Sequence, residues 1–286
     1  MSALLHRHYM NKKTIKDWAI ALVVLCILYF VFPLWLTFGK TKVYDKEGIV
    51  IYANEHTDSS LVAKVADEAN TLLLKHRTKN RNTITCIFYD SDKEFRWRNF
   101  FINSGSLAMN WIPTDYITFK PADFSGNQLG ARLECLNNRT MSSVIAHEYV
   151  HTYQQHQLGF FRYRYHSFFN LWKIEGMAEF VSETSSFPLN KGLEYFTSSE
   201  NNQLSEELRG EYFYFKSHLK ADYLLRYKHI GEEAYWKTDF DQTSLEQEIR
   251  EAILNEQYRP DWEEDNDIVL HDWVYEDGSG YCQISL

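Results

Sequence analysis

Two histidines and a glutamate occur together in the pentapeptide His147-Glu148-Tyr149-Val150-His151, which has the form HExxH. Side chains four residues apart lie on one face of a helix, so both imidazoles can bind a single tetrahedral Zn²⁺. Glu148 is turned about 100° from His147, where its carboxylate can accept a proton from a water on the metal. The pentapeptide also fits two histidines of an ordinary helix, so a third ligand has to decide.

A second acidic motif follows in the segment Trp172–Glu179, which reads WKIEGMAE. Glu175 and Glu179 share one face of a predicted helix. Two inward carboxylates repel each other unless a cation or a hydrogen-bond donor lies between them, as a zinc ion and a zinc-bound imidazole would. The pair also fits two solvated glutamates on an amphipathic helix. The metzincin pattern is excluded, because Gln154 and Gln157 stand where it needs glycine and histidine.

The two motifs together, HExxH and EGxAE, resemble the gluzincin metallopeptidases and, more narrowly, their peptidase-MA-like single-domain branch. The resemblance covers residues 145–180, and the upstream order of strand, helix and strand is compatible with it. It implies a zincin-like fold and one Zn²⁺ per chain. The implied zinc ligands are His147, His151 and Glu175, and the implied general base is Glu148.

The same resemblance assigns roles to two further residues. The family often has a carboxylate four residues after the ligand glutamate, and Glu179 matches that position. Such a partner would fix the tautomer of His147 and raise its basicity. The family also uses a tyrosine or histidine from a later helix to stabilise the oxyanion. Among the candidates Tyr212, Tyr214 and His218, Tyr214 suits that pattern best.

The implied activity is that of a zinc metallopeptidase. Glu148 would pass the proton of the zinc-polarised water to the leaving amine, and Tyr214 would help to hold the oxyanion. An extended peptide would add to a sheet edge, for which residues 116–119 and 131–135 are candidates. Two alternatives remain, namely a zinc hydrolase of a non-peptide amide such as a cell-wall component, and a non-catalytic extracytoplasmic binding domain.

Apolar periodicity predicts the elements that position these residues. We expect strands over 48–53, 83–89, 116–119 and 131–135. We expect helices over 61–75, 141–157, 168–183, 205–229 and 244–255. The first half is thus mixed sheet and helix and the second half mainly helical, which predicts an α+β fold. The tail 260–286 contains several aromatic residues and is expected to pack onto the body.

An uncharged apolar segment, residues 18–38, precedes this body. At about 1.5 Å per residue it is long enough to cross a hydrocarbon core of about 30 Å. Lys12, Lys13 and Lys16 precede it, so the positive-inside rule puts the N-terminus in the cytoplasm. A cleaved signal peptide and a buried core helix are alternatives. The expected organisation is a cytoplasmic segment 1–17, a single-pass transmembrane anchor 18–38 and an extracytoplasmic (periplasmic or extracellular) metallopeptidase domain 41–286.

The charge of the chain limits its partners. The formal net charge is −9, and residues 1–38 carry +3, which leaves −12 on residues 39–286. An acidic body repels nucleic acid and argues against broad contact with anionic lipid. The expected partners are therefore a peptide or protein substrate and, through the N-terminal helix, a membrane, with no nucleic acid.

Cysteine usage argues against a cysteine-based zinc site, because the four cysteines form no CxxC pair. An extracytoplasmic location would permit one disulfide, for which Cys86 and Cys135 are the candidates. Buried free thiols are the alternative.

Overall fold

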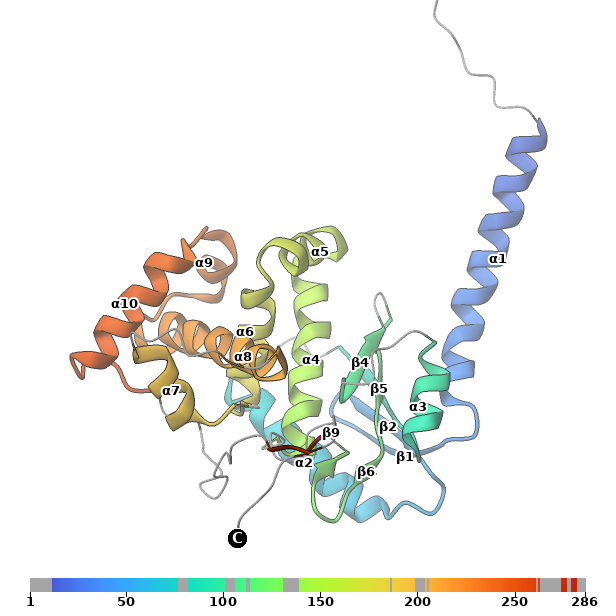
Figure 1. The fold of residues 1–286 in the computed structure, drawn as a ribbon. Helices are drawn as coiled ribbons and strands as arrows, with labels where there is room; N and C mark the ends of the chain where they lie inside the picture. Colours follow the sequence, from blue (N-terminus) through green and yellow to red (C-terminus); the bar gives the residue numbers. More distant parts are fainter. Residues whose placement is uncertain are drawn as a thin grey trace, which may run out of the picture.

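The computed structural model of the chain describes residues 12–76, 82–100, 106–111, 114–130, 139–185, 187–198, 204, 206–260, 262, 274–276 and 279–281. The fold is α+β, as the sequence predicts, with a mixed sheet in the first half and helices in the second (Figure 1). The central helix α4 (Met141–Leu158) lies between the sheet and the helical half and contacts both.

Five strands form the main sheet, in the order β1-β2-β3-β5-β4. Their bounds are Thr41–Lys46 for β1, Ile49–Ala53 for β2, Ile84–Phe88 for β3, Ala108–Trp111 for β4 and Tyr116–Phe119 for β5. The inner strands β2, β3 and β5 run parallel, and each edge strand is antiparallel to its neighbour. Helix α2 (Ser59–Lys75) makes the crossover between β2 and β3 that parallel strands require.

The topology corrects one expectation about the substrate edge. Strand β5, over residues 116–119, is an inner strand because β4 pairs along its free side, so β4 forms this edge of the sheet. The short strand β4 carries no β-branched residue, and the sequence pattern did not predict it. The other candidate edge, residues 131–135, lies outside the described residues.

One face of the sheet packs against α2 and α4 to form the main core. Ile49, Ile51 and Ala53, which alternate along β2, are buried there with Val65 of α2 and Ile145 of α4. Their alternation is the pattern that predicts a strand over residues 48–53, and it arises because one face of β2 lies against these helices.

The other face of the sheet packs against α3 (Asp92–Arg98) and the last turns of α1 (Lys12–Thr37). Leu36, near the end of α1, is fully buried in a cluster with Ile87 of β3 and Phe95 of α3. The end of the apolar segment is therefore part of a second, smaller core.

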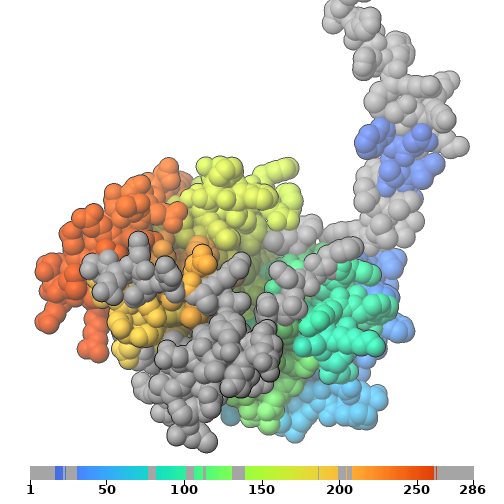
Figure 2. Space-filling view, viewed as in Figure 1, coloured from blue at the N-terminus to red at the C-terminus, as the bar shows by residue number. Residues whose placement is uncertain are grey.

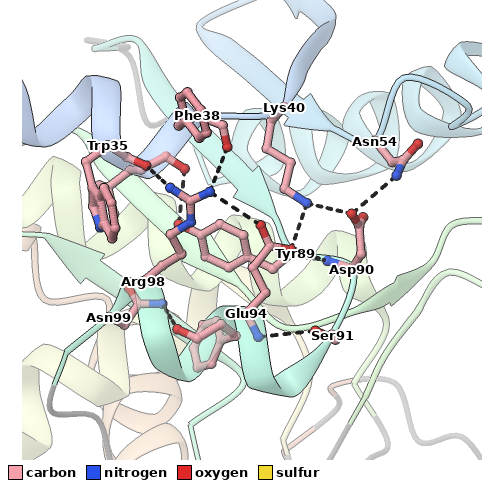
Figure 3. Close-up of polar contacts among 12 residues, drawn as sticks. Trp35, Phe38, Lys40, Asn54, Tyr89, Asp90, Ser91, Glu94, Arg98 and Asn99 are labelled. Carbon is pink, nitrogen blue, oxygen red and sulfur yellow. Dashed lines mark hydrogen bonds and ion pairs between the residues drawn. The ribbon is translucent and has the colours of Figure 1, made fainter.

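Hydrogen bonds reinforce this attachment. The guanidinium of Arg98 donates to the carbonyl oxygens of Trp35, at 2.5 Å, and Phe38, at 2.9 Å (Figure 3). Lys40, just beyond α1, forms an ion pair with Asp90 at 2.9 Å. The carbonyl groups that the helix end leaves without intrahelical partners are thus satisfied by the body of the protein.

The predicted transmembrane anchor over residues 18–38 is wrong. In the part of the chain that the structure describes, no helix has both the length and the apolarity needed to span a membrane. Helix α1 begins at Lys12, inside the charged segment, and Leu36 in its last turn is buried against the sheet. The single-pass topology depended on this anchor and is wrong with it, and the extracytoplasmic placement of residues 41–286 loses the anchor on which it rested.

The second half of the chain is mainly helical. Its elements are α5 (Phe160–Phe169), α6 (Leu171–Ser182), α7 (Leu189–Thr197), α8 (Glu206–Asp222), the π-helical turn η2 (Tyr223–Tyr227), α9 (Glu232–Lys237) and α10 (Gln242–Leu254). Helix α6 packs between α4 and α8. Two further antiparallel pairs lie outside the main sheet among the described residues: β6 (Ala122–Asp123) with β7 (Gln128–Leu129), and β8 (Val274–Glu276) with β9 (Ser279–Tyr281).

Helix boundaries follow the prediction closely except where the chain bends. The helix expected over residues 168–183 is divided at Asn170, which ends α5 and precedes α6. In the tail, Trp262 is buried as expected, while most of residues 260–286 lie outside the described part. Cys86 is a buried free thiol, so it forms no disulfide, and Cys135 lies outside the described residues.

Candidate metal centre

Helix α4 carries the HExxH motif through the middle of the molecule. Thr140 caps its N-terminus, since its hydroxyl accepts a hydrogen bond from the backbone N–H of Ser143 at 3.2 Å. His147 and His151 are buried, whereas Glu148 is half-buried. Four-residue spacing on this helix places the two imidazoles on one face, with their ring planes nearly perpendicular and their centroids 4.7 Å apart.

Three side chains from two helices bring their donor atoms to one point. The Nε2 atoms of His147 and His151 lie 3.1 Å apart, and Oε2 of Glu175, on α6, lies 3.5 Å from each. Two ligands about 2.05 Å from a tetrahedral zinc ion are about 3.3 Å apart. The three donors therefore have the mutual spacing of ligands to one zinc ion. Among the described residues, this trio is the one group of three or more His, Cys, Asp or Glu side chains placed to share a metal.

The protonation of these groups reflects their mutual attraction. Burial alone would lower the pKa of His147, but the carboxylates of Glu175 and Glu179 outweigh it and raise the pKa to about 9. Burial would raise the pKa of Glu175, yet the two imidazoles hold it well below its usual range. Glu175 is therefore ionised and pairs with both rings.

A fully buried carboxylate supports the first histidine from behind. Oε1 of Glu179 lies 3.3 Å from Nδ1 of His147 and also pairs with the guanidinium of Arg139. Burial would raise the pKa of Glu179, but Arg139 and His147 lower it, so the group stays ionised. A negative acceptor at Nδ1 holds the proton on that nitrogen and leaves Nε2 free to bind a metal.

Gln154 orients the ring of the second histidine, His151. Its side-chain oxygen lies 3.2 Å from Nδ1 of His151, and its side-chain nitrogen donates to the carbonyl oxygen of Ile174 at 2.9 Å. This amide therefore orients His151 and ties α4 to α6 one residue before Glu175. Gln154 lies three residues after His151, so helical spacing alone places it beside that ring.

Glu148 lies where α4 meets the edge strand β4. The side-chain amide of Asn110, on β4, donates to the backbone carbonyl of Glu148 at 3.3 Å and to the hydroxyl of Thr152 at 3.0 Å. Glu148 is therefore on the side of α4 that faces the sheet edge, and its half-buried side chain keeps access to solvent.

The structure distinguishes the three candidates for the oxyanion-binding group, all on α8. Tyr214 is the candidate that Glu175 influences most, because the charge of Glu175 is the largest cause of the raised pKa of Tyr214. Its ring also lies 5.7 Å from the guanidinium of Arg139. Tyr212 instead packs in an aromatic cluster with Phe187, and His218 is buried behind Glu179.

Sequence reasoning missed Arg139, Gln154 and Asn110 as supporting residues. Arg139 precedes α4 and reaches α6, so no periodicity links it to Glu179. Asn110 acts from a strand that the sequence pattern did not indicate.

No model of a known protein family matches this chain. No curated protein matches its sequence either. The resemblance to the gluzincin metallopeptidases, and the zincin-like fold that it implies, therefore rest on the HExxH and EGxAE motifs of the sequence.

Proposed function

We propose that this protein is a zinc-dependent peptidase in which His147, His151 and Glu175 bind one Zn²⁺ and Glu148 is the general base. The observation that carries the proposal is the convergence of two Nε2 atoms and one carboxylate oxygen, 3.1–3.5 Å apart, from two different helices. A chance HExxH pentapeptide gives no reason for a glutamate of a distant helix to meet both rings at this spacing.

The chain supplies the remaining groups of such a reaction. Bound Zn²⁺ supplies a Lewis acid that polarises a carbonyl oxygen and lowers the pKa of a water molecule. Glu148 would accept a proton from the attacking water and give it to the leaving nitrogen. Tyr214, which lies within the electrostatic influence of Glu175, would donate its hydroxyl hydrogen to the developing oxyanion. Glu179 and Gln154 hold the two rings in the required tautomers.

The edge strand β4 favours an extended peptide as substrate. It runs beside the motif helix and is joined to it at Glu148 through Asn110. A peptide that added to this edge as a further strand would have its backbone fixed by main-chain hydrogen bonds and would pass next to the general base. A small non-peptide amide has no use for such an edge.

A substrate panel tests the proposal. Zinc-loaded full-length protein is incubated with an unfolded protein, a peptide library and cell-wall fragments, beside the variants Glu148→Gln and Glu55→Gln. Glu55 is an exposed glutamate on the loop after β2 and serves as the matched control. We expect cleavage of peptide bonds by wild type and Glu55→Gln, and a loss of roughly 10²–10⁴-fold in Glu148→Gln.

The other outcomes decide between the alternatives. Cleavage of wall fragments without cleavage of peptides would replace the peptidase by a hydrolase of non-peptide amides. No cleavage of any substrate by a zinc-loaded, folded protein would contradict an enzymatic function and favour a binding domain.

A further inference from the structure

Helix α5 exposes an unusual number of large apolar side chains. The exposed fractions are 87% for Phe161, 76% for Phe168 and 70% for Phe169. Together with three further exposed residues they form what we call the α5 aromatic patch: Phe160, Phe161, Tyr165, Phe168, Phe169 and Leu171. A contiguous apolar surface of this kind marks a contact site on a folded protein, whereas single exposed apolar residues do not.

The patch lies on the outer face of α5, whose inner face is buried against the body of the protein. Tyr163 and His166, three residues apart, are buried against the body, and His166 packs on Trp236. The opposite face carries aromatic rings where a helix at a water-facing surface would carry polar groups. In Figure 1, α5 lies at the end of α4 on the outside of the molecule, and Figure 2 shows this region at the rim of the body.

The charge of the segment that carries the patch differs from that of the rest of the protein. Arg162 and Arg164 are exposed within α5, and the guanidinium of Arg164 lies 5.8 Å from the ring of Phe160. No acidic residue occurs between Glu148 and Glu175, although residues 39–286 carry a net charge of −12. The patch is therefore a basic, aromatic area on an acidic protein.

We propose that the α5 aromatic patch docks on the surface of an anionic lipid bilayer. Aromatic rings favour the interfacial layer of a bilayer, and guanidinium groups beside them attract lipid phosphates and carboxylates. Broad contact of the acidic body with such a surface is repulsive, so the local basic patch also sets the orientation. This contact lies in the plane of the interface and needs no helix that crosses the membrane.

Charge argues against a second copy of the chain as the occupant. A twofold contact through the same patch would bring Arg162 and Arg164 of the two copies together without any acidic residue of the segment to balance them. An anionic surface balances both cations at once.

Docking of α5 would place the candidate metal centre near the bilayer. Helix α5 joins α4 to α6, the two helices that carry the metal-binding residues. Its buried residue Tyr163 belongs to the main core together with Val150 of α4 and Ile174 of α6, so the inner face of α5 packs on the two helices that carry the centre. The lipid contact itself is independent of the proposed peptidase activity.

Vesicle flotation tests the proposal with the full-length protein. Binding is measured to vesicles of phosphatidylcholine with phosphatidylserine and to vesicles of phosphatidylcholine alone. The variants are Phe161→Ser/Phe168→Ser, Arg162→Gln/Arg164→Gln and the control Leu74→Ser/Leu254→Ser. Leu74 and Leu254 are 61% and 62% exposed on α2 and α10, so the control removes comparable apolar surface elsewhere.

We expect wild type and the leucine control to float with the anionic vesicles, and the phenylalanine variant to stay behind. The affinity of the arginine variant for the anionic vesicles should fall on the order of tenfold. This variant should also no longer prefer anionic vesicles to vesicles of phosphatidylcholine alone. Flotation of the phenylalanine variant equal to that of wild type would overturn the proposal. A wild-type protein that binds neither kind of vesicle would overturn it as well. A change of oligomeric state in the phenylalanine variant alone would instead assign the patch to a contact between copies of the chain.

Discussion

The carboxylate of Glu179 lies 3.3 Å from Nδ1 of His147, although its side chain is entirely shielded from solvent. The same carboxylate pairs with the guanidinium of Arg139, which keeps it ionised at a depth where an isolated charge is strongly disfavoured. A buried charge held against the back of one imidazole is a costly arrangement, and the metal binding proposed at the front of that ring would account for it.

Replacement of Glu179 by alanine should weaken the metal centre without removing a ligand. His147 would lose the acceptor that orients its ring, so we expect zinc affinity or activity to fall roughly 10–100-fold. Zinc competition with a chromophoric chelator measures the affinity. Glu194→Ala, which removes an exposed glutamate of α7, is the control and should bind zinc as wild type does. Equal affinity in the two variants would refute a role of Glu179 behind His147.

Replacement of Arg139 by methionine should destabilise the fold. The variant leaves the Glu179 carboxylate buried without its cation, which costs about 3–5 kcal/mol in comparable sites. Urea unfolding of metal-free protein gives the free energy of unfolding. The double variant Arg139→Met/Glu179→Leu removes both charges and should recover a large part of the loss. A double variant no more stable than the single one would show that the pair is not coupled.

Substitution of Gly176 by alanine should disrupt the contact of α6 with α8. A Cβ atom at this position would clash with the carbonyl oxygen of Ser217, which is backbone and has little freedom to move. We expect a loss of about 1–3 kcal/mol in the free energy of unfolding. Gly210→Ala, on α8 with open space around it, is the matched control and should gain up to about 1 kcal/mol from helix propensity. Similar effects of the two changes would contradict the close packing at Gly176.

His218 should make the stability of the protein sensitive to acid. Burial lowers its pKa to about 4, with Arg139 and His76 acting in the same direction against Glu179 and Asp222. The unfolded chain takes up a proton near pH 6.5 but the folded protein does not. The neutral ring therefore contributes stability above pH 6.5 that is lost as the pH falls to about 4, about 3 kcal/mol in total.

The variant His218→Phe isolates this contribution. Phenylalanine retains a flat ring against Trp262, on which His218 stacks at 3.9 Å, and it cannot be protonated. Between pH 6.5 and pH 4, wild type should lose about 3 kcal/mol more than the variant in the free energy of unfolding. Parallel pH profiles for the two proteins would mean that His218 is not held neutral.

The sequence predicted the elements whose burial is one-sided and periodic. Ile49 and Ile51 alternate along β2. The helix expected over residues 141–157 also matches α4 to within one residue, although α4 is buried on nearly all sides. The pairing of His147 and His151 followed from helical spacing, and Glu175 was proposed from the second motif.

The features that the sequence missed depend on contacts between distant segments. Arg139, just before α4, pairs with Glu179 of α6, forty residues later in the chain. Strand β4 forms the sheet edge only because it pairs with β5. The transmembrane prediction for the apolar segment 18–38 was wrong for the same reason. Its last turns are apolar because Leu36 packs on the sheet, and hydropathy along the chain cannot distinguish a protein neighbour from lipid.

The metal content of the purified full-length protein tests the central claim most directly. Mass spectrometry after reconstitution with zinc and removal of excess metal should give about one zinc ion per chain in wild type and in Glu148→Gln, and almost none in His147→Ala and Glu175→Ala. Circular dichroism establishes that each variant is folded. A folded wild-type protein without zinc, or a Glu175→Ala variant that keeps it, would contradict the assignment of His147, His151 and Glu175 as a zinc site.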